Sequence, residues 1–333
     1  MLQQLPLTFS SNGGIGGARN RCLRLPSLSS VFCRRQRVTT YVLCTILFLA
    51  LLASFKRVRD TLCRDARGST SCFLESAPGA IPSLDALTHL VLVAGNAVFT
   101  GTKFELAEED GQWSLEDYQL GQGRVFLEHI KKAVEIVDAD PDALLIFSGG
   151  KTRSQAGPLS ESESYWRLAS AKAWFGFTNS VSWRALTEDH ARDSFENLLF
   201  SICRFRQVTG RYPSDITMIS LELKRDRIEA QHRVAIRYPL SRFHYIGIDP
   251  AFENPREHGT SEGLDRAAEA FAADPYGCFH ETLLQKRKSR NPFKETIPYP
   301  AGCPEIARLV RYCGRDIYKG PLPWDSQISR RSP

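Results

Sequence analysis

Small residues follow two apolar runs of the chain and could bind an anion. Ser148, Gly149 and Gly150 come directly after one run, and Gly95 ends another. Glycine lets backbone amides approach an anionic group closely, because no Cβ stands in the way. The same residues would equally suit a tight turn between a strand and a loop.

Basic residues gather in the segment 223–238. Lys224, Arg227 and Arg233 carry charges that suit a phosphate or a carboxylate. His232 could serve as a general acid or base. A helix with this many charges is also typical of a solvated surface.

Acidic and amide side chains complete the set of candidates. Glu163 lies three residues after Ser160, the spacing of a helix-capping box. Glu188 opens a polar segment, and we expect Glu188, Glu196 or His232 to move protons. Helix capping alone would also explain an acid at position 188. The other candidates for ligand binding in this segment are Ser194 and Asn197.

Several well-known site motifs are missing, which narrows the function. GGKT at 149–152 is not a P-loop, because Leu145 stands where that motif needs glycine. No GxGxxG follows the first apolar run, and no HExxH or CxxC occurs. We therefore predict no dedicated metal site and leave the cofactor unknown, although Glu163 and Glu188 could hold Mg²⁺ through water.

The elements that would position these residues alternate along the chain. Short apolar runs predict buried strands at 89–95, 143–150, 181–186, 215–220 and 243–249. Apolar residues at helical spacing predict helices at 117–137, 160–176, 188–205 and 226–237. This alternation predicts an α/β fold, a Rossmann-like parallel sheet with helices on both faces. Ligands of such sheets bind beyond the carboxyl ends of the strands, where the candidate residues would converge.

An apolar segment near the start predicts a membrane anchor. Residues 38–55 (VTTYVLCTILFLALLASF) are 18 residues without a charge, about 27 Å long as a helix. That length predicts a single transmembrane helix, embedded in the lipid bilayer of the ER or Golgi. The arm at 1–37 has arginines but no acid, so a mitochondrial membrane is the alternative. Basic residues flank the span on both sides and leave its orientation open.

The rest of the chain divides by composition. After a basic, disordered arm (1–37) and the span, we expect a linker at 56–84, a Rossmann-like domain at 85–255, and a helical and irregular C-terminal extension at 256–333 packed on it. The net charge is +6, and the arm alone contains six arginines. The remainder is therefore neutral, which argues against a nucleic-acid partner. Six cysteines follow the span; their even number permits disulfides without showing them.

The order of these blocks resembles the domain of unknown function 218 family of bacterial envelope proteins. The blocks are VLVAG (91–95), FSGG (147–150), Glu163, the segment 188–197, and Ser220 leading to His232 and Arg233. The tail is similar to a fungal, membrane-anchored branch through GIDP (247–250), DPYGC (274–278), KRKSRNPF (286–293) and CPEI (303–306).

The resemblance implies a Rossmann-like domain tethered to a membrane, with a nucleotide-like ligand such as S-adenosylmethionine. This chain departs from the bacterial pattern after the fourth strand, where that pattern places a histidine close to the serine. Lys224 and Arg227 occupy this stretch here, and His232 comes later.

Together these observations favour a membrane protein that binds a small, phosphate-bearing anion. Ser148, Gly149 and Gly150 would cradle the anion, and Lys224, Arg227 and Arg233 would neutralise its charge. The reaction, if one occurs, would be hydrolysis or transfer at a phosphate ester or anhydride. The alternatives are a non-catalytic binding or scaffold protein and a protein that binds S-adenosylmethionine.

Overall fold

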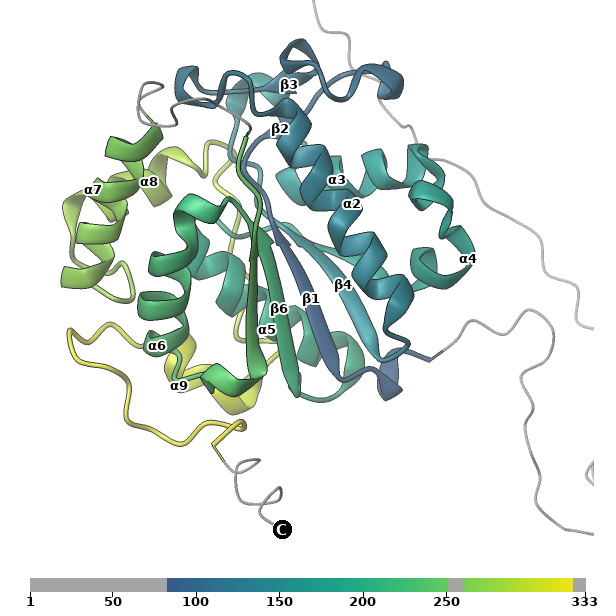
Figure 1. Ribbon diagram of the computed structural model, residues 1–333. Coiled ribbons are helices and arrows are strands. Elements are labelled where there is room, and N and C mark those ends of the chain that lie inside the picture. The colour runs from purple at the N-terminus through teal and green to yellow at the C-terminus, as the bar shows by residue number, and fades with distance from the viewer. Residues whose placement is uncertain (1–82, 251–259, 326–333) are drawn as a thin grey trace, which may run out of the picture. The chain divides into compact units, whose positions relative to one another are not determined.

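The core of the fold is a five-stranded parallel sheet, seen in the computed structural model, which describes residues 83–250 and 260–325. The strand order is β5-β4-β1-β6-β7 (Figure 1). The strands are β1 (His89–Ala94), β4 (Ala143–Ser148), β5 (Ala185–Glu188), β6 (Asp215–Ser220) and β7 (Phe243–Gly247). The chain moves outward from β1 in one direction and then returns to continue from β6 in the other. The order therefore reverses between β1 and β6, the place where Rossmann-like sheets bind ligands.

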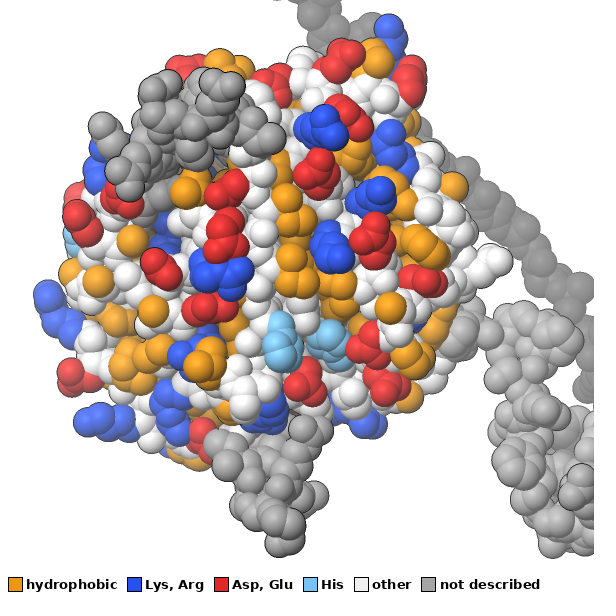
Figure 2. Space-filling model, viewed as in Figure 1, with side chains coloured by type: hydrophobic (Ala, Val, Ile, Leu, Met, Phe, Trp, Pro, Cys, Tyr) orange, Lys and Arg blue, Asp and Glu red, His pale blue; other side chains and the backbone are white. Residues whose placement is uncertain are grey.

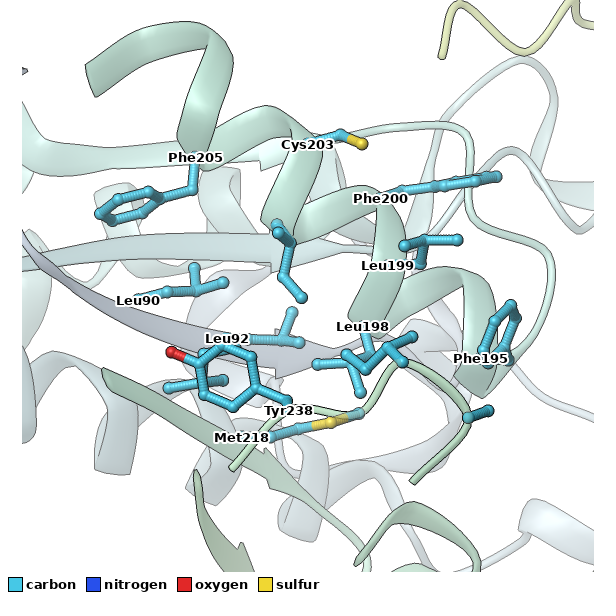
Figure 3. Close-up of a cluster of buried hydrophobic side chains, with 14 of the residues drawn as sticks. Leu90, Leu92, Phe195, Leu198, Leu199, Phe200, Cys203, Phe205, Met218 and Tyr238 are labelled. Carbon is cyan, nitrogen blue, oxygen red and sulfur yellow. The ribbon is translucent and has the colours of Figure 1, made fainter. Parts of the chain in front are cut away.

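Alternate residues of the strands fill two separate cores. Leu90 and Leu92 of β1 belong to one cluster, and Val91 and Val93 to the other; all four are fully buried. Successive side chains of a strand point to opposite faces, so a strand covered on both faces must be apolar throughout. Figure 3 shows the first cluster, in which Phe205 and Met218 lie near the leucines of β1.

Helices cover both faces of the sheet (Figure 1). The face of Val91 is covered by α2 (Gly123–Ala139), α3 (Glu161–Ala171) and the short α4 (Thr178–Val181). The face of Leu90 is covered by α5 (Ser194–Thr209) and α6 (Arg233–Ala235). Serine and aspartate caps begin two of the helices: Ser160 Oγ accepts from the Glu163 amide, and Asp193 Oδ1 accepts from the Glu196 amide.

Short elements complete this part of the chain. β2 (Val98–Phe99) and β3 (Trp113–Ser114) form a small antiparallel pair. The segment Arg227–His232 is a π-helix. The 3₁₀ turns are Leu84–Ala86, Phe104–Leu106, Asp110–Gln112, Asp117–Gln119, Ser154–Ala156, Ala173–Gly176, Ser182–Arg184, Glu222–Lys224, Leu240–Arg242 and Pro304–Ile306.

The C-terminal extension packs into the core beside α5. It contains α7 (Thr260–Ala273), α8 (Glu281–Ser289) and α9 (Ala307–Val310). Phe271, Leu283 and Trp324 are fully buried in the cluster that also holds Leu90. The extension therefore contributes to the same hydrophobic core as the sheet.

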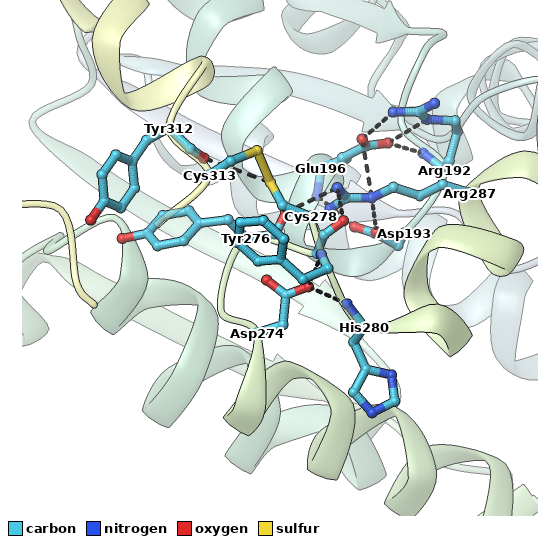
Figure 4. Close-up of a disulfide and its surroundings, with 12 residues drawn as sticks. Arg192, Asp193, Glu196, Asp274, Tyr276, Cys278, His280, Arg287, Tyr312 and Cys313 are labelled. Carbon is cyan, nitrogen blue, oxygen red and sulfur yellow. Dashed lines mark hydrogen bonds and ion pairs between the residues drawn. A yellow bond between two sulfur atoms is a disulfide. The ribbon is translucent and has the colours of Figure 1, made fainter. Parts of the chain in front are cut away.

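Two disulfides fasten the extension. Cys203 of α5 pairs with Cys303, with the two Cα atoms 4.9 Å apart. Cys278 pairs with Cys313, with the Cα atoms 5.6 Å apart, and Figure 4 shows this second disulfide beside Tyr276. The four cysteines of the extension and α5 are thus all paired, a point that the sequence left open.

The predicted elements agree with the structure except at several boundaries. The strand predicted at 181–186 is wrong for 181–184, which form helical turns; β5 begins at Ala185. The helix predicted from residue 188 begins only at Ser194, because Glu188 ends β5 and Asp193 caps α5. The helix predicted at 117–137 begins at Gly123. The helix predicted at 160–176 ends at Ala171, and the one predicted at 226–237 is a π-helix over Arg227–His232 before the short α6.

No helix of residues 83–250 and 260–325 is long and apolar enough to cross a bilayer. The span predicted at 38–55, the basic arm and almost all of the linker lie outside the described residues. The face drawn in Figure 2 has basic and acidic side chains interspersed.

Candidate functional site

A cavity of about 200 Å³ opens where the strand order reverses. Gly95 and Asn96 follow β1, and Leu221 and Lys224 follow β6, so two neighbouring strands deliver their next residues to one place. The lining residues that the sequence predicted as ligand-binding are Gly95, Ser194, Asn197, Lys224 and Arg227. The lining residues that it did not predict are Asn96, Tyr118, Gln119, Gln122, Leu221, Gly263, Arg266, Lys286 and Arg290.

Cations dominate the charge of this cavity. Lys224 and Arg227 come from the segment after β6, and Lys286 and Arg290 lie four residues apart at the end of α8. Residues spaced by four share a face of a helix, so Lys286 and the C-cap residue Arg290 both reach the cavity. Within the described residues, neither lysine forms an ion pair with a carboxylate.

The pKa values of Lys224, Lys286 and Arg227 are depressed, because burial disfavours their charged forms. Burial, with the guanidinium of Arg227 nearby, lowers the pKa of Lys224 well below its usual range. Burial, with Arg290 and Arg227 nearby, lowers the pKa of Lys286 to about 7. Burial also lowers the pKa of Arg227 to about 10, so this group stays charged at neutral pH. An anion in the cavity would stabilise the charged forms of all three groups.

Amide side chains organise the part of the wall that Lys224 contacts. Lys224 Nζ donates to Asn96 Oδ1, and Gln119 Nε2 donates to the Asn96 carbonyl at 2.7 Å. Arg153, itself paired with Glu116, donates to Gln119 Oε1 at 3.1 Å. The loop between β1 and α2 is therefore held to the cavity by a network of neutral and charged hydrogen bonds.

The glycines after β1 and β4 are needed for a different reason from the predicted one. The amides of Gly149 and Gly150 donate to the carbonyls of Glu188 and Ala191, at 3.0 and 2.7 Å. They are therefore committed to the backbone, and the predicted anion cradle at Ser148, Gly149 and Gly150 is wrong.

A carboxylate occupies the space beside two of these glycines. A Cβ added to Gly95 or Gly149 would lie 2.5 or 2.6 Å from Glu161 Oε2. Glu161 is buried at the start of α3, and its other oxygen accepts from Thr152 Oγ1. The absence of side chains at 95 and 149 thus lets Glu161 approach the strand ends.

Two predicted residues point elsewhere. Glu163 is half-exposed, forms a 2.6 Å ion pair with Arg167 and borders a shallow groove beside Trp166, away from the cavity. Arg233 donates to the carbonyls of Glu229 and Tyr238 and so fastens the end of its own helix. Glu163 and Arg233, both predicted to bind the ligand, therefore do not line the cavity.

Glu196 serves the helix start rather than the cavity. It forms ion pairs with Arg192 at 2.5 Å and with Arg287 of α8 at 3.3 Å. Arg287 also donates to Asp193 Oδ2 at 2.6 Å (Figure 4). The charge of Arg287 holds the pKa of Asp193 well below its usual range, against the opposite effect of its burial. These contacts connect the extension to the cap of α5, so the predicted proton transfer by Glu196 has no support in this geometry.

Glu188 does not contact the cavity directly, and Ser148 connects it to the lining residue Asn197. Ser148 Oγ donates to Glu188 Oε2 at 2.8 Å and also lies 3.1 Å from Oδ1 of Asn197. Burial raises the pKa of Glu188 to about 7, so the carboxyl group is half-protonated near neutral pH. Glu188 does not line the cavity itself.

His232 lies directly behind Ser194. Its Nε2 is 2.8 Å from Ser194 Oγ, and the imidazole is fully buried. Burial, with Arg227 nearby, lowers the pKa of His232 well below its usual range. The imidazole is therefore neutral at pH 7.

The described residues contain no cluster of three or more His, Cys, Asp or Glu side chains that could hold a metal ion. The two acidic residues considered for Mg²⁺ lie apart, because Glu163 borders the shallow groove and Glu188 is buried and lines neither cavity. The polar side chains that line the cavity are therefore cations, amides, one tyrosine and one serine.

The sequence contained a signal for the residues that were missed. Lys286 and Arg290 belong to KRKSRNPF (286–293), where the spacing of four predicts a shared helix face. Asn96 directly follows a strand end and was open to the same argument that selected Gly95.

Comparisons with known proteins give one informative match. No family model matches the chain, and no solved structure matches it. The chain is similar to an uncharacterized protein of Saccharomyces cerevisiae, YOR238W, with 28% identity over 73% of this chain and 99% of the yeast protein.

Proposed function

We propose that this protein binds a small phosphate-bearing anion in the cavity between the ends of β1 and β6. The observation that carries this proposal is the convergence of Lys224, Arg227, Lys286 and Arg290 on one cavity. Burial and neighbouring cations depress the pKa values of the two lysines, so negative charge beside them would stabilise their charged forms. A phosphate group would supply that charge together with several hydrogen-bond acceptors.

The size of the cavity favours a phosphate head group over a whole dinucleotide. About 200 Å³ is below the ordinary range for drug-sized ligands. The remainder of such a ligand would extend outside the cavity. S-adenosylmethionine, which carries a positive sulfonium and a positive ammonium group, fits this cationic site poorly, and we therefore rank that alternative last.

The proposal includes the predicted membrane anchor at 38–55 and membership in the domain of unknown function 218 family. The order of the sequence blocks and the parallel sheet support the family. The two disulfides favour an oxidising compartment. We therefore place the domain on the luminal side of an ER or Golgi membrane, with the arginine-rich arm on the cytosolic side.

Isothermal titration of the full chain in detergent micelles with pyrophosphate tests the binding proposal. The wild type should bind, and K224A/R227A should lose at least tenfold in affinity while keeping its circular dichroism spectrum. Because Arg227 is buried, K224M provides a milder variant should the double variant unfold. K288M, which removes an exposed lysine of the same helix as Lys286, is the matched control and should bind like the wild type. Equal affinity in K224M and K288M would reject the proposal.

A further inference from the structure

Ser194 and His232 form a hydrogen-bonded pair at the wall of the cavity. Ser194 Oγ lies 2.8 Å from His232 Nε2. Ser194 is the first residue of α5 and lines the cavity, whereas His232 ends the π-helix and is fully buried behind the serine. The hydroxyl is therefore open to a ligand on one side and in contact with an imidazole on the other.

The imidazole is fixed in this position by aromatic rings. Phe271 and Phe195 pack against it edge-on, with ring centroids 4.5 and 5.7 Å away. Within the described residues, His232 Nδ1 has no hydrogen-bond partner. Holding a buried imidazole with one polar atom unsatisfied costs free energy, so the position requires an explanation beyond packing.

A serine in contact with a neutral imidazole is the arrangement of an activated nucleophile. Burial disfavours the protonation of His232 most, Arg227, Arg287 and Lys286 nearby add to this effect, and Asp193 opposes it. The net effect leaves the imidazole neutral and able to accept a proton. The positive end of α5 at Ser194 and the cavity cations would stabilise negative charge on an attacked phosphoryl group.

We propose that Ser194 is the nucleophile and His232 the general base of a phosphoryl-transfer reaction in this cavity, an inference that rests on the anion binding proposed above. Ser194 Oγ forms a bond to phosphorus while the bond from phosphorus to the leaving-group oxygen breaks. The serine proton moves to His232 Nε2 and from there to the leaving oxygen. Water then attacks the phosphoserine and gives its proton to His232. The bond between phosphorus and Ser194 Oγ breaks, and the serine regains a proton, so the net reaction is hydrolysis of a phosphate ester or anhydride.

The test uses the full chain in detergent micelles with two activated donors, p-nitrophenyl phosphate and acetyl phosphate. Their good leaving groups make knowledge of the natural leaving group unnecessary. Acid-quenched protein is digested and examined by mass spectrometry for phosphate on Ser194. Release of p-nitrophenol is followed in parallel, and orthophosphate binding is measured by titration calorimetry on the same preparation.

The wild type should carry phosphate on Ser194 and release p-nitrophenol. S194A should lose both signals while still binding orthophosphate. H232Q, whose amide can occupy the position of Nε2, should lower the labelling rate by about 100-fold or more, the size of a general-base contribution. S241A is the control and should behave like the wild type, because Ser241 lies before the start of β7, at the other end of the parallel strands from the cavity.

The outcomes separate the two proposals. Orthophosphate binding without any phosphoserine at position 194 would overturn the Ser194–His232 proposal and leave anion binding intact. Turnover by S194A equal to that of the wild type would also overturn it. Failure of the wild type to bind orthophosphate would instead remove the proposed function on which this reaction depends.

Discussion

Lys224 and Lys286 line the same cavity, although Lys224 follows β6 and Lys286 belongs to the C-terminal extension. The charge of Lys286 contributes to lowering the pKa of Lys224. Two separate segments therefore bring like charges together at the reversal point of the sheet. Such a placement of like charges costs free energy, and an anion bound between the two groups would offset that cost.

Replacing Gly95 by alanine should destabilise the fold and weaken anion binding. The new Cβ would lie 2.5 Å from Glu161 Oε2 and 2.8 Å from Glu161 Cβ, so the start of α3 has to shift. Overpacking of this kind costs about 1–3 kcal/mol. Urea denaturation measures the change, and G111A is the control because a Cβ at position 111 meets nothing within 4 Å. Equal losses in the two variants would show that Glu161 does not restrict position 95.

Replacing Glu188 by glutamine should flatten the dependence of stability on pH. Burial raises the folded-state pKa of this carboxyl group to about 7, above the value of about 4.3 in the unfolded chain. Between these two pH values the folded state binds more protons than the unfolded state, so the free energy of unfolding falls as the pH rises. Urea denaturation of the wild type and E188Q at pH 5 and pH 7.5 measures this effect. Between these pH values the free energy of unfolding of the wild type should fall by a few kcal/mol, and that of E188Q should fall by less. The same pH dependence of the free energy of unfolding in both proteins would contradict the raised pKa of Glu188.

Replacing Asp193 by asparagine should remove the link between the extension and α5. The variant leaves the largely buried Arg287 with backbone carbonyls and with the carboxylate of Glu196, 3.3 Å away, and we expect a loss of about 3 kcal/mol. Because the folded-state pKa of Asp193 is depressed, its contribution is present above about pH 4 and is lost as the pH falls below that value.

A half-exposed ion pair provides the comparison for Asp193. Asp325 accepts from Arg237 at 2.8 Å, with about a third of each side chain exposed. D325N should therefore cost less than about 1 kcal/mol. Urea denaturation at pH 7 and pH 3 distinguishes the two ion pairs. The difference in the free energy of unfolding between the wild type and D193N should be smaller at pH 3 than at pH 7. A difference that stays constant would contradict the coupling of Asp193 to Arg287.

The disulfides should stabilise the domain to different extents. Cys203–Cys303 closes a loop of 100 residues and Cys278–Cys313 one of 35. Chain entropy then predicts contributions of about 4.7 and about 3.8 kcal/mol to the free energy of unfolding. Denaturation of C203A/C303A and C278A/C313A measures both, and mass spectrometry under non-reducing conditions checks the pairing in the wild type. An unfolding midpoint unaffected by reductant would contradict both the pairing and the oxidising location proposed from it.

The apolar runs predicted the sheet well because a strand buried on both faces must be apolar along its whole length. The run at 181–186 wrongly predicted a strand over residues 181–184, which are helical. Arg184 is buried there and donates to the carbonyls of Val137, Asp140 and Ala143. Such long-range hydrogen bonds leave no trace in local spacing.

The candidate site was predicted in part, for a physical reason. Lys224 and Arg227 follow a strand end, so the topology of a parallel sheet places them at the reversal point. Lys286 reaches the cavity only because the extension packs beside α5, which depends on contacts such as Asp193–Arg287. The glycines were assigned to the wrong role, since their backbone hydrogen bonds and the approach of Glu161 are visible only in three dimensions.

The most direct test of the cationic cavity is the proton uptake that accompanies sulfate binding to the full chain. Sulfate does not titrate near neutral pH, so any proton taken up comes from the protein. At pH 8, Lys286, with a pKa of about 7 in the free state, is mostly neutral and regains its charge beside the anion. Titration calorimetry in buffers of different ionisation enthalpy should therefore report uptake of about one proton or more per sulfate, with affinity falling as the pH rises above 7. K286M should take up about one proton fewer, and K288M should match the wild type. Sulfate binding without proton uptake, or with the same uptake in K286M, would contradict the account.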